Sequence, residues 1–270
     1  MARLVAAGTR ARASRAIAHA GRLAWGAWAC AVFALLAPLV FVAVVSAGSL
    51  AARRRVAKAG TRALFALWFT PPRVTGSLER RSGEEAAAGD ERPGGGGRPC
   101  LVVANHASYL DGLLLTAVLP PGIAFVAKRE LQPQRFAGLL LRRLGALFVE
   151  RFDAQRSAED ARLVAEHLAR GEQVVVFAEG TFLREPGLLP LRMGAFVNAA
   201  AQGVPVVPVA IRGTRTMLPG DDLFPTRARL EVVIGEPLRP SGDDWRAALS
   251  LREQVRAWLL ARTGEPDLEP

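Results

Sequence analysis

The chain contains a 30-residue stretch without a charged side chain, from Leu23 to Ala52. As a helix rising 1.5 Å per residue it would be about 45 Å long, whereas a bilayer's hydrocarbon core is about 30 Å thick. Tilting, a kink at Pro38, or a hairpin bent within one leaflet would absorb the excess. Trp25 and Trp28 fit an interfacial aromatic belt. We predict a helical membrane anchor here and leave open whether it spans or re-enters.

The positive charge of the chain lies beside this stretch. Of the 35 Lys and Arg residues, nine Arg and one Lys fall in residues 1–62, which contain no acidic residue, and the remaining 25 balance the 25 Asp and Glu. A basic end beside an apolar segment suits an anionic lipid surface, where each cation contributes about 1 kcal/mol. A nucleic-acid binder would carry its basic patch on the folded domain, so no nucleic-acid partner is expected.

Basic residues flank both ends of the apolar stretch, so the charge pattern does not settle its orientation. Before it stand Arg10, Arg12, Arg15 and Arg22, and after it Arg53, Arg54, Arg55 and Lys58. The symmetry favours a segment whose two ends stay on the cytosolic side. The length of the stretch and the basic flank after it argue against a cleaved signal peptide.

These features divide the chain into two parts. Residues 1–72 contain the basic N-terminus and the anchor, and end in the apolar run at 61–70, which is either an interfacial helix or an ordinary core helix. Residues 73–270 form the main domain. Within it, a Gly- and Glu-rich stretch at 82–98 is expected to be a flexible loop.

Cysteine and histidine use points to a reducing compartment and to no metal site. The two cysteines, Cys30 and Cys100, lie in apolar surroundings and form no disulfide framework. The three histidines, His19, His106 and His167, are too dispersed for zinc. We expect a domain that faces the cytosol.

Apolar strand-like runs alternate with helical patterns through the main domain. The predicted strands cover residues 99–104, 123–127, 146–150, 173–177, 206–211 and 230–234, and the helices 112–118, 135–144, 158–170 and 193–202. Such alternation indicates an α/β fold with a mostly parallel sheet covered by helices on both faces. In these folds, chemistry gathers in the loops beyond the carboxyl ends of the strands.

The sharpest local signal is NHASYLDG at residues 105–112, directly after a predicted strand. A turn of five residues can bring Asp111 back onto the imidazole of His106. A carboxylate on one ring nitrogen fixes the tautomer and leaves the other nitrogen free to accept a proton. The pair could deprotonate a hydroxyl, although a histidine that only caps a helix or binds a loop carbonyl fits the same spacing.

Other predicted strands also end in polar residues. Lys128 ends one, Arg151 follows another, and FAEGTFLREPG at 177–187 supplies Glu179, Gly180 and Thr181. Lys and Arg beside exposed backbone amides make a phosphate-binding site plausible. Any one of these groups alone would be an ordinary solvated loop.

Together these blocks resemble the ordered motifs of the glycerolipid acyltransferase family, whose best-known members are 1-acyl-sn-glycerol-3-phosphate (lysophosphatidate) acyltransferases. The similarity spans roughly residues 75–235 and rests on NHASYLDG, FVAKREL, ALFVER, FAEGTFLREPG and VPVVPVAIRGT. The resemblance implies that His106 is the catalytic base and Asp111 its partner. It implies acceptor binding by Arg151, Glu179, Gly180 and Thr181, a positive charge from Lys128, and a shaping role for Pro205 and Pro208.

Two departures from the family pattern concern the acceptor. Ala178 stands in place of a proline, and Phe182 in place of an arginine. Without that arginine, tight recognition of a phosphate monoester needs a substitute such as Arg184 or Arg192, or the acceptor is a different lysolipid. Glu150, where Asp is commoner, is a milder change.

The resemblance implies a membrane-associated O-acyltransferase. It would move a fatty acyl group from acyl-CoA or acyl-ACP to a lysophospholipid, first of all 1-acyl-sn-glycerol-3-phosphate, without a metal, a cofactor or a covalent acyl-enzyme. Its partners would be membrane lipids, and its site the inner membrane with the domain facing the cytosol. The alternatives are the same reaction on another lysolipid such as lyso-ornithine lipid, a hydrolase, which lacks a G-x-S-x-G elbow here, and a non-catalytic lipid-binding module.

Overall fold

The computed structural model describes residues 2–78, 99–150, 154–220 and 222–269. For residues 2–16, 18 and 154–160 it describes the backbone alone. The predicted loop at 82–98 lies outside this set. Among the described residues, seven strands form one sheet in the order β1-β7-β6-β2-β5-β3-β4. Neighbouring strands from β6 to β4 are parallel, whereas β7 is antiparallel to β6 and parallel to β1. The prediction of a mostly parallel α/β sheet is confirmed.

The six predicted strands all form, each with both ends within one residue of the prediction. The strands are β1 (Arg73–Thr75), β2 (Cys100–Ala104), β3 (Ala124–Lys128), β4 (Leu147–Val149), β5 (Gln173–Phe177), β6 (Val206–Arg212) and β7 (Glu231–Ile234). The helices are α1 (Ala2–Ser46), α2 (Leu50–Leu67), α4 (Leu110–Val118), α5 (Ala137–Arg143), α6 (Ala154–Ala169), α7 (Gly194–Ala201), α8 (Thr214–Met217) and α9 (Trp245–Thr263), with a 3-10 turn at Arg129–Leu131.

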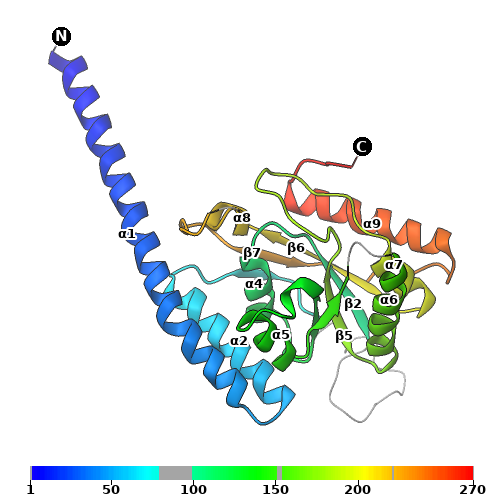
Figure 1. Ribbon diagram of the computed structural model, residues 1–270. Coiled ribbons are helices and arrows are strands. Elements are labelled where there is room, and N and C mark those ends of the chain that lie inside the picture. The colour runs from blue at the N-terminus through cyan, green and yellow to red at the C-terminus, as the bar shows by residue number, and fades with distance from the viewer. Residues whose placement is uncertain (1, 79–98, 151–153, 221, 270) are drawn as a thin grey trace.

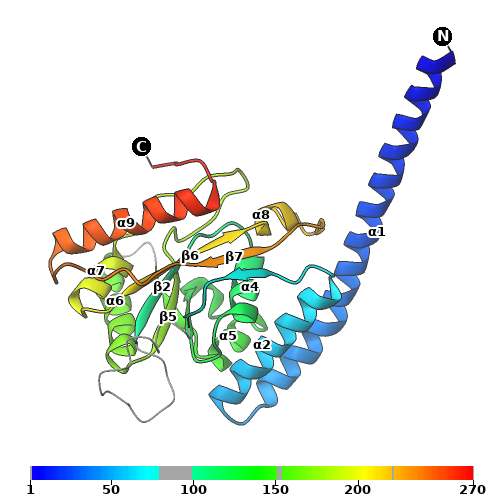
Figure 2. The same ribbon diagram turned by 180° about the vertical axis from the view of Figure 1, so that it is seen from behind.

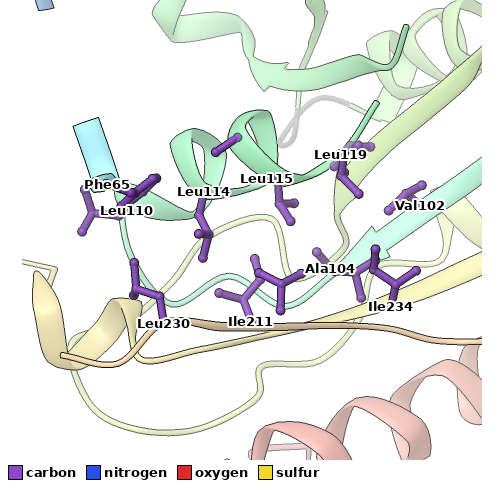
Figure 3. Packing of buried hydrophobic residues seen from close by; sticks show 14 of the residues in the cluster. Phe65, Val102, Ala104, Leu110, Leu114, Leu115, Leu119, Ile211, Leu230 and Ile234 are labelled. Atoms are coloured by element: carbon purple, nitrogen blue, oxygen red, sulfur yellow. The ribbon is translucent and has the colours of Figure 1, made fainter. Parts of the chain in front are cut away.

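The pleat of the central strands divides the core into two layers. In β2, Val102 and Ala104 face one layer with α2 and α4, whereas Leu101 and Val103 face the other with α6, α7 and α9. Figure 3 shows side chains of α4 lying over Ala104 and Ile211 in the first layer. Because β2 is buried on both faces, its sequence is continuously apolar rather than alternating.

The apolar N-terminal segment forms a helical hairpin with α2. Helix α1 continues through Pro38 and ends at Ser46, after which the chain turns back and α2 runs along α1 (Figures 1 and 2). A Cβ atom on Gly60 would lie 2.5 Å from Val40, so glycine permits this close approach. The outer side of α1 keeps Leu35 and Leu39 exposed.

Basic residues of α2 hold the hairpin to the domain. Arg54 donates to the backbone oxygens of Leu144 and Gly122, at 3.0 and 2.7 Å. Lys58 and Arg62 donate at 2.7 and 2.9 Å to carbonyls at the end of α4, where the helix dipole favours a cation. The sequence assigned Arg54 and Lys58 to a lipid surface, but the structure places their head groups on α4, α5 and the loops that follow.

The aromatic residues at 61–70 belong mainly to the core. Leu64, Phe65 and Trp68 are buried against α4 and the sheet, whereas Phe69 stays exposed and stacks on Trp28 of α1. The run is therefore the end of a packed helix, with only its last aromatic side chain open to the surroundings.

Helix α9 was not predicted. It packs on β6 and α7, and its start is marked by Asp244, whose side chain accepts a hydrogen bond from the Ala247 amide at 2.8 Å. It ends at Gly264, which has a φ of 69°. Both capping residues, Asp244 and Gly264, are of the types that usually begin and end helices.

Candidate active site

His106 lies two residues beyond the carboxyl end of β2, where Asn105 fixes the main chain. The Asn105 side chain donates to the carbonyl of Ile211 at 3.1 Å and accepts from the amide of the same residue at 2.7 Å. Asn105 is buried and continues the ladder between β2 and β6. This role was not predicted, although the asparagine stands directly before the histidine.

Asp111 folds back onto the imidazole as the spacing predicted. Its Oδ2 atom lies 2.8 Å from Nδ1 of His106 and accepts the backbone amides of Ala107 and Ser108 at 2.6 and 2.9 Å. The carboxylate is fully buried, and Oδ1 has no hydrogen-bond partner among the described residues. A carboxylate oxygen only accepts, so this contact calls for the tautomer with the proton on Nδ1, and Nε2 is then the ring's acceptor nitrogen.

Two aromatic rings contact the imidazole, and a third packs on one of them. The ring of Phe177 stacks on His106 with centroids 4.3 Å apart, and Phe182 meets it edge-on at 4.5 Å. Tyr109, itself largely exposed, packs on Phe182 at 4.8 Å. Phe182, which stands in place of the expected arginine, therefore contacts His106 directly. It presents an apolar ring to the imidazole.

Glu179 joins the first and third motifs. Its Oε1 accepts the His106 amide at 2.6 Å and its Oε2 accepts the Leu189 amide at 2.8 Å. Burial raises the pKa of Glu179 from 4.5 to about 7; the two amides and the cation of Arg215 offset part of this rise, while the charge of Asp111 adds to it. Glu179 thus acts on the position of the histidine main chain, a contact that the sequence did not indicate.

Gly180 and Thr181 continue the third motif toward solvent. Gly180 has a φ of 80°, and a Cβ there would lie 2.5 Å from Nε of Arg192, so the arginine side chain passes over the glycine. Thr181 is exposed. Of the two arginines considered as substitutes for the missing one, Arg192 lies at this turn, whereas Arg184 forms an exposed ion pair with Asp222 at 3.4 Å.

Lys128 and Arg151 are not shown beside the histidine. Lys128 ends β3, which is separated from β2 by β5, so a strand spacing of about 4.8 Å places the two strands about 10 Å apart. Arg151 lies outside the described residues. Within the part of the chain that the structure describes, no three His, Cys, Asp or Glu side chains gather as metal ligands would.

Two other nucleophilic side chains, Ser108 next to the site and Cys100 at the opposite, amino end of β2, are not available for catalysis. The hydroxyl of Ser108 donates to the carbonyl of Leu218 at 2.7 Å and accepts the Leu110 amide at 3.2 Å. Burial raises the pKa of the Cys100 thiol to about 12, so it stays protonated at neutral pH. Neither group is disposed to form an acyl-enzyme.

An apolar cavity of about 430 Å³ lies beside Phe177. Its walls come from β3, β4, β5, α6 and α7 and include Val126, Val149, Val164, Val176, Phe177 and Met193. Glu150 and Arg192 are its charged lining residues. The volume falls in the range of about 300–1,000 Å³ usual for small-ligand pockets, and Phe177 is shared with the wall of the histidine site.

A buried carboxylate, an imidazole held by it and a neighbouring apolar cavity lie together at the carboxyl ends of β2 and β5. Residues 77–212 match the family model described as Acyltransferase, and the chain belongs to this family. It is 31% identical over 147 residues to the chloroplastic 1-acyl-sn-glycerol-3-phosphate acyltransferase BAT2 of Brassica napus, covering 54% of this chain and 42% of that one. It is 33% identical over 187 residues to the lyso-ornithine lipid O-acyltransferase of Pseudomonas aeruginosa, covering 62% and 69%.

The fold is similar to the crystal structure of the 1-acyl-sn-glycerophosphate (LPA) acyltransferase PlsC from Thermotoga maritima. The TM-score is 0.66 at 23% identity, over 91% of this chain and 94% of that one. The chain spans about half the length of several of the curated relatives that it matches.

The burial of Glu179 predicts a pH-dependent stability. Because folding raises the pKa of this acid from 4.5 to about 7, the folded state holds the proton more tightly and loses stability as pH rises through that window. The loss totals about 3 kcal/mol and is complete above about pH 7. Urea unfolding between pH 5 and 7.5 should show this slope in the wild-type protein and not in Glu179→Gln. Glu185→Gln, on the same loop but exposed, controls for the lost charge; parallel curves for wild type and Glu179→Gln would contradict the assignment.

Proposed function

We propose that the protein transfers a fatty acyl group from acyl-CoA or acyl-ACP to the free hydroxyl of a lysophospholipid, with His106 as general base. The contact between His106 and Asp111 at the carboxyl end of β2 carries this proposal. Membership of the acyltransferase family and the names of the relatives support it. The catalytic roles of both residues are part of the proposal.

In the proposed reaction, Nε2 of His106 takes the proton of the lipid hydroxyl, and the hydroxyl oxygen attacks the thioester carbonyl. Asp111 stabilises the imidazolium that forms, because the buried carboxylate lies 2.8 Å from Nδ1 and its negative charge balances the positive charge on the ring. The tetrahedral intermediate then collapses, the carbon–sulfur bond breaks, and the imidazolium returns its proton to the leaving thiolate. The products are the ester and free CoA or acyl carrier protein.

The acceptor we propose first is 1-acyl-sn-glycerol-3-phosphate, with phosphatidate as product. The relatives named for that reaction support it, and Arg192 at the third motif supplies a cation. A second acceptor, lyso-ornithine lipid, is favoured by Phe182, which puts an aromatic ring where the resemblance expects a phosphate-binding arginine. Two relatives are named for that second reaction.

We propose that the cavity beside Phe177 takes an acyl chain. We also propose that α1 lies in one leaflet of the inner membrane, with the domain on the cytosolic side. Among the described residues, His19–Ser46 is the helix long and apolar enough to cross a bilayer. Helix α2, with its basic residues, runs along the same part of α1, and a spanning α1 would carry those charges and α4 into the hydrocarbon. The re-entrant alternative avoids this cost.

Replacing His106 with Ala should lower transfer by at least about 10²–10⁴-fold, the usual contribution of a positioned general base. Asp111→Asn should also lower kcat, because the tautomer is no longer fixed. The assay follows free CoA with acyl-CoA and lysolipid supplied together and separately. Thr116→Val, on the same helix as Asp111, is the matched control. CoA release without a lysolipid would favour a hydrolase, and near-normal transfer by His106→Ala would reject the mechanism.

Phe182→Arg should increase preference for lysophosphatidate over lyso-ornithine lipid by about tenfold or more. A charge-assisted hydrogen bond to phosphate contributes about 1.5–3 kcal/mol, and each 1.4 kcal/mol is a factor of ten. The measurement compares kcat/KM for the two acceptors, with Phe182→Leu as the apolar control. The wild-type ratio decides between the two proposed acceptors. An unchanged ratio in Phe182→Arg would show that position 182 does not meet the acceptor headgroup.

A further inference from the structure

Arg215 lies in α8, just beyond β6, and its side chain is 13% exposed. Its guanidinium donates hydrogen bonds to several backbone carbonyls of one loop. The accepting carbonyls are those of Leu183, Glu185 at 2.7 Å, and Arg184 and Gly187 at 3.5 Å. All belong to the stretch that follows Phe182 in the third motif.

The same loop is held from its other side by the segment after α9. Nε of Arg215 donates to one oxygen of Glu265 at 3.1 Å, and the other oxygen accepts the Gly187 amide at 2.5 Å. The Leu188 amide donates to the carbonyl of Pro266 at 2.8 Å, and the Leu268 amide returns to Leu188 at 3.1 Å. These residues, from 215 onward, lie outside the part of the chain that matches the family model.

Carbonyl oxygens that converge in this way repel one another unless a cation lies among them. The planar guanidinium offers five N–H donors in a fixed fork, whereas a lysine ammonium is a compact charge that cannot reach both Glu265 and the loop carbonyls with the same geometry. The conformation of residues 183–187 therefore depends on an arginine at position 215.

This loop sets the position of Phe182. The ring of Phe182 touches His106 and Tyr109, and a Cβ on Gly220 would lie 3.4 Å from it. The imidazole has its own support in Asp111, which does not depend on the loop. A change in residues 183–187 therefore acts first on the aromatic wall beside His106, whereas the contact between His106 and Asp111 involves no residue of this loop.

We propose that Arg215, clasped by Glu265, is a positioning residue that holds Phe182 in the wall of the acceptor site. The inference rests on the proposed acyl transfer at His106. Its effect acts through Phe182 and concerns the acceptor lipid rather than the acyl donor.

The test is a double-mutant cycle of Arg215→Lys with Phe182→Ala, with Arg212→Lys as control. Arg212, half exposed, lies three residues away and pairs with Glu231 at 3.6 Å. In the wild-type background, Arg215→Lys should raise the acceptor KM about tenfold, with donor KM and kcat changed less than about twofold. In the Phe182→Ala background the same substitution should change acceptor KM less than about twofold, since the residue through which it acts is gone.

Equal losses in both backgrounds, or equal effects on donor and acceptor KM, would overturn the proposal, because a merely structural role predicts them. If Arg215→Lys does not fold, Glu265→Gln tests the same clasp and should raise acceptor KM about threefold in the wild-type background only. A wild-type protein without transfer activity would instead reject the proposed function. An active wild type with additive losses would reject the role of Arg215 alone.

Discussion

One carboxylate oxygen, Oδ2 of Asp111, organises the site. It accepts the imidazole of His106 and two consecutive backbone amides, and it is sealed from solvent. The same atom therefore fixes the turn after β2 and the orientation of the His106 ring. A buried carboxylate with this many short contacts stabilises positive charge on its neighbour, which is the state that a general base enters in the transition state.

The sheet order explains why the remaining parts meet there. Strand β2 lies between β6 and β5, and both neighbours run parallel to it, so three loops leave the same edge. Asn105 ties the first loop to β6, and Glu179 ties it to the loop after β5. Two buried polar side chains thus set the main chain around His106, at a cost in desolvation that the raised pKa of Glu179 records. The fold supplies a rigid frame, and the loops supply the chemistry.

The sequence was most informative where burial leaves a continuous apolar run. Strand β2 is buried on both faces and was predicted within one residue, and the spacing of His106 and Asp111 correctly placed them together. The sequence was least informative about the direction of each strand and about which strands pair with each other. The antiparallel course of β7 depends on tertiary contacts, not on the local pattern of Glu231–Ile234.

Charged residues were the other source of error. Arg54 and Lys58 fit an anionic lipid surface, yet they cap carbonyls of the domain, because a cation satisfies a helix C-terminus as well as it satisfies a phosphate. Phe182 stands where the family resemblance expects an arginine, but a single sequence does not show that its ring contacts His106. Arg215, which binds the loop at 183–187, is held by Glu265, 50 positions further along the chain, and no local pattern in the sequence reveals this contact.

The most direct measurement of the central claim is ¹⁵N NMR of protein with labelled histidine, with His106 assigned by comparison with His106→Ala. The account predicts that neutral His106 carries its proton on Nδ1, facing Asp111, and that Asp111→Asn alters this preference. A neutral His106 protonated on Nε2 in the wild-type protein would contradict the account, because the nitrogen assigned to the lipid hydroxyl would then be a donor rather than a base.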